Sequence, residues 1–214
     1  MKKLFLLMLF TIFPLGSLNA AVAMSTEVLA LSESWAEIKY QMPEDQRVEA
    51  LEKLTEKAET LVKDNPGTAE PIVWHAIIVS TLAGEKGGLG ALSLVKEAKK
   101  LLERAEAFDP DVLNGSVYTS LGSLYYQVPG WPIGFGSDDK AKSYLKKALA
   151  VNPNGMDPNY FYGDFLLQEG EYSEAVEVLT RALAAPARDS RPIADAGRRA
   201  EIEEALKKVK LAMQ

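Results

Sequence analysis

The feature that most constrains this chain is a helical segment ending in proline that occurs four times. The four segments are AETLVKDNP, LLERAEAFDP, YLKKALAVNP and VLTRALAAP, and their prolines follow one another at intervals of 44, 43 and 33 residues. A helical motif that recurs at such a period, with insertions of varying length, is typical of an α-solenoid, in which each repeat buries its apolar face against the next. We therefore predict an all-α fold of antiparallel helix pairs.

The clearest copy of the motif covers residues 157–186. Gly163 lies in the middle of its first helix, and Gly170 follows that helix. Ala175 and Ala182 are seven residues apart, so they lie on one face of the second helix. Small residues at these positions let the two helices pack closely. The pattern resembles the tetratricopeptide repeat, which implies a solenoid of helix pairs that binds or assembles other proteins.

The resemblance divides the remaining chain into repeats of unequal length. Relative to the clearest copy, one upstream repeat has seven extra residues and the one before it has ten. We predict that both insertions lie in the turn between the two helices of their repeat. The expected fold is a tetratricopeptide-like α-solenoid with long inter-helix insertions. Its predicted parts are a degenerate repeat at 26–66, repeats at 69–110, 115–153 and 157–186, and a C-terminal capping helix at 190–213.

The N-terminal segment has the pattern of a signal peptide. Lys2 and Lys3 precede the apolar run 4–13, and small residues suited to cleavage after Ala20 or Ala23 follow it. The apolar run is too short to span a membrane. We predict a mature chain from about residue 24 that is periplasmic or secreted, with no stable membrane insertion. Because the chain contains no cysteine, a lipid-bearing cysteine is excluded.

Composition argues against several classes of function. With no cysteine, thiolate catalysis and zinc–thiolate sites are excluded, and a single histidine, His75, argues against a histidine-based metal centre. The formal charge is −6, and an acidic chain repels nucleic acid. We find no cofactor fingerprint and no nucleophile–base pair. The chain is therefore predicted to be non-enzymatic, without cofactor or metal, and His75 is expected in the core or groove.

An apolar insertion, YYQVPGWPIGFG at residues 125–136, interrupts one repeat. Its two prolines stiffen the backbone, which reduces the entropy lost on binding, and tryptophan is enriched in interface hot spots. We predict that Trp131 and Phe135 lie at one edge of the binding groove, seated on Tyr125 or Tyr126. The alternative is a compact Ω-loop that folds back as a lid over the core.

Two further clusters are candidate binding sites. In the first, Tyr160 and Tyr162 accompany Asp157 and Asp164 at the start of one helix, where the carboxylates invite an acid–base or cation role. The simpler interpretation is turn and helix-cap chemistry, with tyrosines packed between repeats.

The second cluster consists of four arginines, at positions 188, 191, 198 and 199, after the last repeat. Arg188, Arg191 and Arg198 are candidates for an anion pocket on the groove, because guanidinium groups bind carboxylates and phosphates. The alternative is ion pairing with the protein's own acidic surface, which would make only a modest contribution to stability.

These patterns predict a periplasmic adaptor or assembly factor that binds a protein partner. A more specific resemblance is to the accessory components of tripartite ATP-independent periplasmic transporters, which share this fold; no motif establishes that link. The alternative function is a small-ligand-binding or transport accessory protein that uses the groove and the aromatic loop. A hydrolase that uses Asp157 and Asp164 is a third class.

Overall fold

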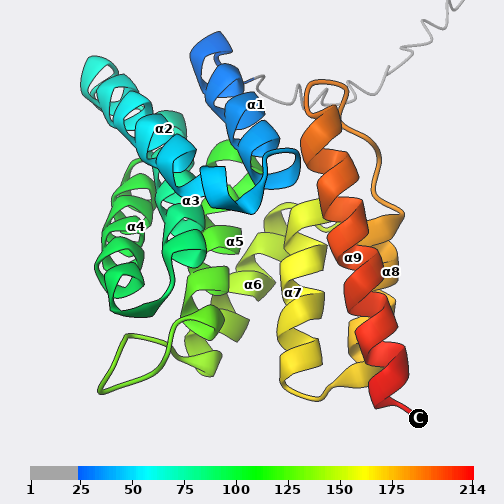
Figure 1. Cartoon of the computed structure of the whole chain (residues 1–214). Helices are drawn as coiled ribbons and strands as arrows, with labels where there is room; N and C mark the ends of the chain where they lie inside the picture. Colours follow the sequence, from blue (N-terminus) through cyan, green and yellow to red (C-terminus); the bar gives the residue numbers. More distant parts are fainter. Residues whose placement is uncertain (1–23) are drawn as a thin grey trace, which may run out of the picture.

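The computed structural model describes residues 24–214 and shows an all-helical protein (Figure 1). The predicted signal peptide lies outside the described residues. Within them the chain forms nine α-helices and no strand, which confirms the all-α prediction. None of these helices combines the length and apolar character that crossing a membrane requires. The helices are α1 (Thr26–Tyr40), α2 (Glu44–Asp64), α3 (Ala69–Lys86), α4 (Gly88–Phe108), α5 (Val112–Gln127), α6 (Asp138–Val151), α7 (Met156–Gln168), α8 (Tyr172–Leu183) and α9 (Pro192–Ala212).

The helices form two layers. Helices α3, α5 and α7 pack side by side in an inner layer, and each is covered by the helix that follows it, α4, α6 or α8. Helix α9 continues the inner layer, because it packs on both α7 and α8. The first helix, α1, packs on α3 and also on α9, so the two ends of the inner layer meet. Figure 1 shows α1 and the upper part of α9 side by side. The solenoid is therefore closed on itself.

Two repeats contain the same close contact between their paired helices. A Cβ atom at Gly122 of α5 would lie 2.6 Å from Cγ of Leu145 in α6, and one at Gly163 of α7 would lie 2.6 Å from Cγ of Leu179 in α8. Both leucines are fully buried. The glycines are required because any larger residue would push the second helix away.

Each covering helix has small residues seven positions apart that face the inner layer. All six are fully buried in the core, so the spacing identified in the sequence is a packing pattern. The pairs are Ala98 and Ala105, Ala141 and Ala148, and Ala175 and Ala182.

The two insertions have different structures. The seven extra residues of the later repeat lie in a loop at 128–137 between α5 and α6, as predicted. The ten extra residues of the earlier repeat do not form a loop, which corrects our prediction for that repeat. They lengthen α3 and α4, and only Gly87 separates the two helices. Gly87 and Gly88 have φ values of 60° and 58°, a backbone conformation that glycine adopts without strain.

His75 of α3 is buried, and neither ring nitrogen has a hydrogen-bond partner among the described residues. Burial lowers the pKa of His75 below its ordinary value of 6.5; Glu59 of α2 opposes this effect, and Lys63 adds to it. The folded protein therefore holds His75 neutral, as expected for a core residue.

The close contact at Gly163 predicts a large asymmetry between two glycine substitutions. We expect Gly163→Ala to lower the free energy of unfolding by about 1–3 kcal/mol, because the new methyl group collides with Leu179. Gly84→Ala is the control: Gly84 lies within α3 with no neighbour within 4 Å, and alanine there should raise stability by about 0.5–1 kcal/mol. Urea unfolding measures both. Equal stability of the two variants would refute the packing argument.

The buried histidine predicts a loss of stability in mild acid. The pKa of His75 is lower in the folded than in the unfolded chain, so its contribution is complete above pH 6.5 and is lost as the pH falls below that value. We expect the free energy of unfolding to fall between about pH 7 and pH 5.5, and His75→Leu to remove most of that slope. His75 is the only histidine in the chain. A slope that survives in the variant would assign the effect to other groups.

Candidate functional site

The loop between α5 and α6 is anchored at its base. The Phe135 ring packs edge-on against Tyr125, with ring centres 5.6 Å apart, and Lys99 of α4 lies 5.7 Å above the Phe135 ring. The backbone closes on itself through a 3.0 Å hydrogen bond from Gly136 N to Pro129 O. A Cβ at Gly136 would lie only 1.9 Å from a backbone oxygen, so this closure requires glycine. The loop therefore has a defined shape.

The tip of the same loop is displayed to solvent. Trp131 is 89% exposed and Ile133 is 60% exposed, the reverse of what large apolar side chains normally do. At the base of the loop Val128 is buried and Phe135 is partly buried, whereas Trp131 and Ile133 at the tip face outward. The base of the loop packs on the core, as in the lid interpretation, and the tip is exposed, as the recognition interpretation requires.

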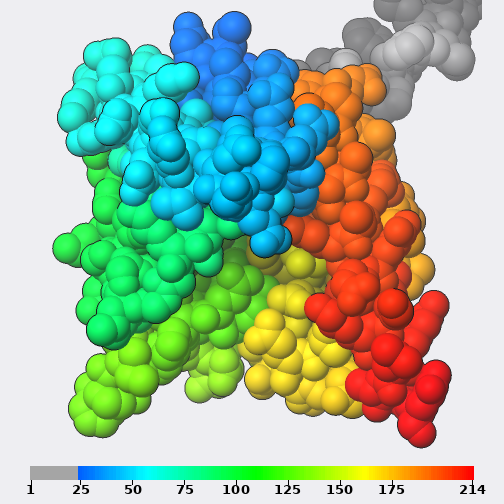
Figure 2. Space-filling view, in the orientation of Figure 1, coloured from blue at the N-terminus to red at the C-terminus, as the bar shows by residue number. Residues whose placement is uncertain are grey.

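A third exposed apolar residue lies in the neighbouring turn. Leu89, just after the glycine turn between α3 and α4, is 87% exposed. Figure 1 shows this turn and the α5–α6 loop at the same end of the molecule, and in Figure 2 the loop projects beyond the neighbouring helices. We name Leu89, Trp131 and Ile133 the apolar edge. We did not predict Leu89 from the sequence, although its place between Gly88 and Gly90 favours a turn at the surface.

Three of the residues we predicted to contact a partner are buried, and we correct them here. Tyr125 and Tyr162 are each 4% exposed and belong to the core, and Arg198 is 6% exposed. Tyr126 is half-buried, and its hydroxyl donates a 2.8 Å hydrogen bond to Asp164, so it does not seat the loop. Phe135 is seated on Tyr125, whereas Trp131, which we expected beside it, is exposed.

The arginines form an ion-pair cluster around Asp157. Arg188 Nη1 lies 2.7 Å from Asp157 Oδ2, and Arg198 Nε lies 2.9 Å from Asp157 Oδ1. Arg188 also pairs with Asp195, and Arg198 pairs with Glu201. Burial alone would raise the pKa of Asp157, but Arg198 and Arg188 hold it well below its usual value. The cluster thus favours our alternative interpretation, ion pairing within the protein.

The cluster sits where the first and last helices meet. Lys39 of α1 pairs with Glu201 of α9 at 3.2 Å, and the Tyr40 hydroxyl donates a 3.3 Å hydrogen bond to the same glutamate. A Cβ at Gly197 would lie 2.3 Å from the Tyr40 ring, so glycine permits the contact. Tyr160 joins the cluster under the Arg198 guanidinium, 4.4 Å from its ring centre. These contacts therefore form one connected set, which joins Lys39, Tyr40, Tyr160, Arg198 and Glu201.

Arg191 is the exception within the cluster. Within residues 24–214 it makes no ion pair, and its Nε is buried without a hydrogen-bond partner. Its guanidinium lies 5.0 Å from the Trp74 ring centre. Arg191 also lines a pocket of about 280 Å³ between α1 and the start of α9, together with Glu33 and Glu37.

The two aspartates do not form a paired-carboxylate site. Asp157 is engaged by arginines, whereas Asp164 accepts hydrogen bonds from Tyr126 and Gln168. Each carboxylate is therefore held by its own partners within the protein, as the simpler interpretation of structural roles has it. In the part of the chain that the structure describes, no group of acidic residues and histidine is arranged to hold a metal ion.

The burial of Arg198 predicts a larger effect than the modest one we inferred from sequence. We expect Arg198→Ala to lower the free energy of unfolding by about 3 kcal/mol, because it removes a buried guanidinium and leaves the half-buried Asp157 carboxylate with one fewer partner. Lys53→Ala is the control, since the Lys53–Glu49 pair on α2 is largely exposed and its removal should change nothing measurable. Chemical unfolding compares them. Equal effects would show that the cluster contributes no more than a surface pair.

Comparisons with known proteins find a family match over part of the chain and a similar fold. Residues 136–202 match the tetratricopeptide repeat family model. A solved structure described as a thermophilic TPR protein, TTC0263 of Thermus thermophilus, has a TM-score of 0.56 and 21% identity over 84% of this chain and 89% of that chain. A structure of MamA has a TM-score of 0.45 and 18% identity over 79% of this chain and 92% of that one. Comparison with curated proteins finds no match.

The family match and the structural likeness to TTC0263 agree with the packing. The matched segment contains the Gly163–Leu179 contact and the buried alanines of α8, the features on which the resemblance was first based. Residues 136–202 therefore match the tetratricopeptide repeat family, and the described chain has the fold of a tetratricopeptide-repeat protein.

Proposed function

We propose that this protein is a non-enzymatic adaptor that binds a protein partner through its apolar edge. The tetratricopeptide fold commonly serves protein–protein interaction, and its members generally act as scaffolds. The single observation that carries the proposal is the 89% exposure of Trp131 at the tip of an anchored loop. Burying such a side chain against a partner would release apolar surface from water at little conformational cost.

The position of the apolar edge supports docking there rather than in a central groove. Arg198 contacts both Tyr160 and Glu201 near the place where α1 and α9 meet, so these side chains already have partners within the protein. The edge, by contrast, presents Leu89, Trp131 and Ile133 without a covering element. A partner that places an apolar pocket or helix at this edge would bury Trp131 and Ile133 of the loop tip.

We further propose that the adaptor works outside the cytoplasm, as a periplasmic or secreted protein. The support is the charged, apolar and small-residue order of the first 23 residues. A role as accessory to a transporter is a narrower version of this proposal, which rests on resemblance alone. Localisation of a tagged full-length chain and N-terminal sequencing of the exported product test the export.

The small-ligand function is a second candidate, and the structure offers one place for it. Arg191 has an unsatisfied buried Nε beside the pocket between α1 and α9, and a carboxylate group would complete its hydrogen bonds. Dialysis with acetate and with inorganic phosphate, followed by thermal unfolding, tests it. Stabilisation that Arg191→Gln abolishes would favour the ligand-binding function.

The split loop predicts that affinity and stability respond to different residues. We expect Trp131→Ala with Ile133→Ala to leave thermal unfolding unchanged and to weaken partner binding by about 2 kcal/mol, as hot-spot truncation does. Phe135→Ala should instead lower stability by about 1–3 kcal/mol, because Phe135 is partly buried against Tyr125. Affinity capture from a periplasmic extract, followed by titration of the captured protein, gives the affinities, and thermal unfolding gives the stabilities.

Phe108→Ala is the matched control for this experiment. Phe108 is 51% exposed and lies at the opposite end of α4 from Leu89, so its truncation should change neither property. If the tip variant captures and binds the same partner as strongly as the unaltered chain, the apolar edge is not the docking surface.

A further inference from the structure

The last described helix lacks the cover that every other comparable helix has. Helices α3, α5 and α7 of the inner layer are each covered by the next helix of the chain. Helix α9 takes the same inner position, on α7 and α8, but no helix follows it within residues 24–214. Within the described chain one face of α9 is exposed, and it carries the apolar residues Leu211 and Met213.

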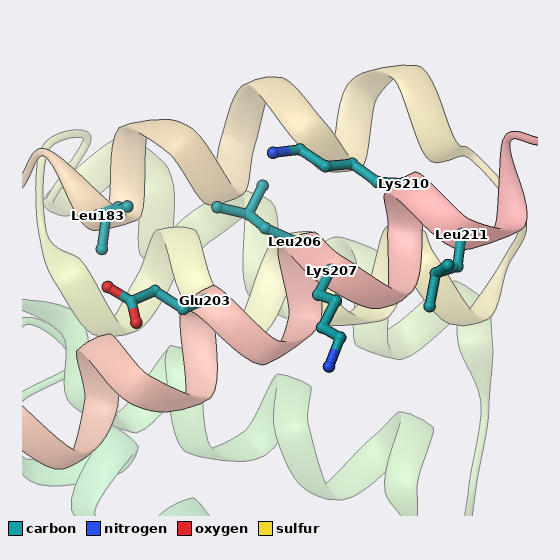
Figure 3. Close-up of a pocket in the computed structure, with 6 residues that line it drawn as sticks. All are labelled: Leu183, Glu203, Leu206, Lys207, Lys210 and Leu211. Carbon is teal, nitrogen blue, oxygen red and sulfur yellow. The ribbon is translucent and has the colours of Figure 1, made fainter.

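The open face contains a groove of about 430 Å³ between α8 and α9. Three leucines form its apolar part, Leu183 from α8 and Leu206 and Leu211 from α9. Figure 3 shows Leu206 pointing toward α8 and Leu211 pointing to the other side of α9. Leu211 is 60% exposed, and Met213, two residues further along the chain, is 54% exposed. The groove and the adjoining exposed face of α9 together thus present apolar side chains between charged ones.

The charged residues of this part of α9 are separated along the helix, and three of them, Glu203, Lys207 and Lys210, line the groove. Glu203 and Glu204 lie in one half of this segment, and Lys207, Lys208 and Lys210 lie in the other. All five are exposed. None makes an ion pair within the described part of the chain, although Glu203–Lys207 and Glu204–Lys208 have the i, i+4 spacing that permits one.

This separation makes α9 complementary to itself. When two copies of the helix run antiparallel, the acidic half of each lies against the basic half of the other, so both halves gain opposite-charge neighbours. Leu206, between the two halves, lies near the centre of such a pair. A two-fold axis gives this arrangement directly, because a C2 interface uses the same surface on both subunits.

We infer that the α8–α9 groove binds α9 of a second copy of this chain, antiparallel, and that the protein forms a homodimer through this face. The leucines of the groove supply the apolar contact, and the separated charges determine the direction of the two helices. This inference does not depend on the proposed adaptor function, because the apolar edge lies on other helices.

A charge-exchange experiment tests the inference in the full mature chain. The first variant, Lys207→Glu with Lys210→Glu, has an acidic α9 face; the second, Glu203→Lys with Glu204→Lys, has a basic one. We expect the unaltered chain to sediment as a dimer and each variant alone to sediment as a monomer. An equimolar mixture of the two variants should recover the dimer, because the acidic face of one copy then meets the basic face of the other.

Two controls separate this result from unfolding and from the adaptor proposal. Lys142→Glu with Lys146→Glu changes two exposed lysines of α6 in the same way and should leave the dimer intact. Trp131→Ala with Ile133→Ala should also remain dimeric, whatever its effect on partner binding. A monomeric unaltered chain at about 100 µM, well above the dissociation constant of a stable homodimer, would overturn the inference. A mixture that stays monomeric while both variants show native circular dichroism would also overturn it. So would a dimer that persists in each of the two charge-changed variants alone.

Discussion

The carboxylate of Asp157 is the group on which the closed arrangement of helices depends. Arg188, in the connection before α9, and Arg198, within α9, both pair with it, so the last helix is drawn across α7. In that position Gly197 meets Tyr40 of α1. The inner layer then has no free end, and a surface that would be concave in an open solenoid becomes an interior of charged and aromatic contacts. The apolar edge and the α8–α9 groove then remain as the surfaces proposed for partners.

The local packing of this fold could be predicted from the sequence. Gly163, Ala175 and Ala182 mark one repeat because small residues are needed where two helices touch, and that requirement is visible without coordinates. The equivalent contact of Gly122 with Leu145 survives an insertion of seven residues, since the loop is added outside the helix contact. Insertion in a turn costs little, so the repeat pattern remains readable around it.

The features that could not be predicted depend on distant partners or on competing conformations. The residues between the cores of α3 and α4 are rich in glycine, which suggested a loop, yet most of them extend helices because Leu94 and Val95 continue an apolar face. The pairing of Lys39 with Glu201 joins residues at the two ends of the described chain, and charge types alone do not select it among many alternatives. Nor does the sequence show which aromatic residue of the loop is buried, since Trp131 and Phe135 are both large and apolar.

Closure of the solenoid and exposure at its rims are two consequences of one constraint. A repeat protein must bury the apolar face of each unit against a neighbour, and here α1 completes the inner layer while the outer face of α9 stays uncovered. The apolar edge and the α8–α9 groove lie on opposite sides of the molecule in Figure 1. A second copy seated in the groove would therefore leave both apolar edges free. Two edges on one rigid dimer would bind a paired or repeated partner more tightly than either edge alone, because the second contact becomes intramolecular.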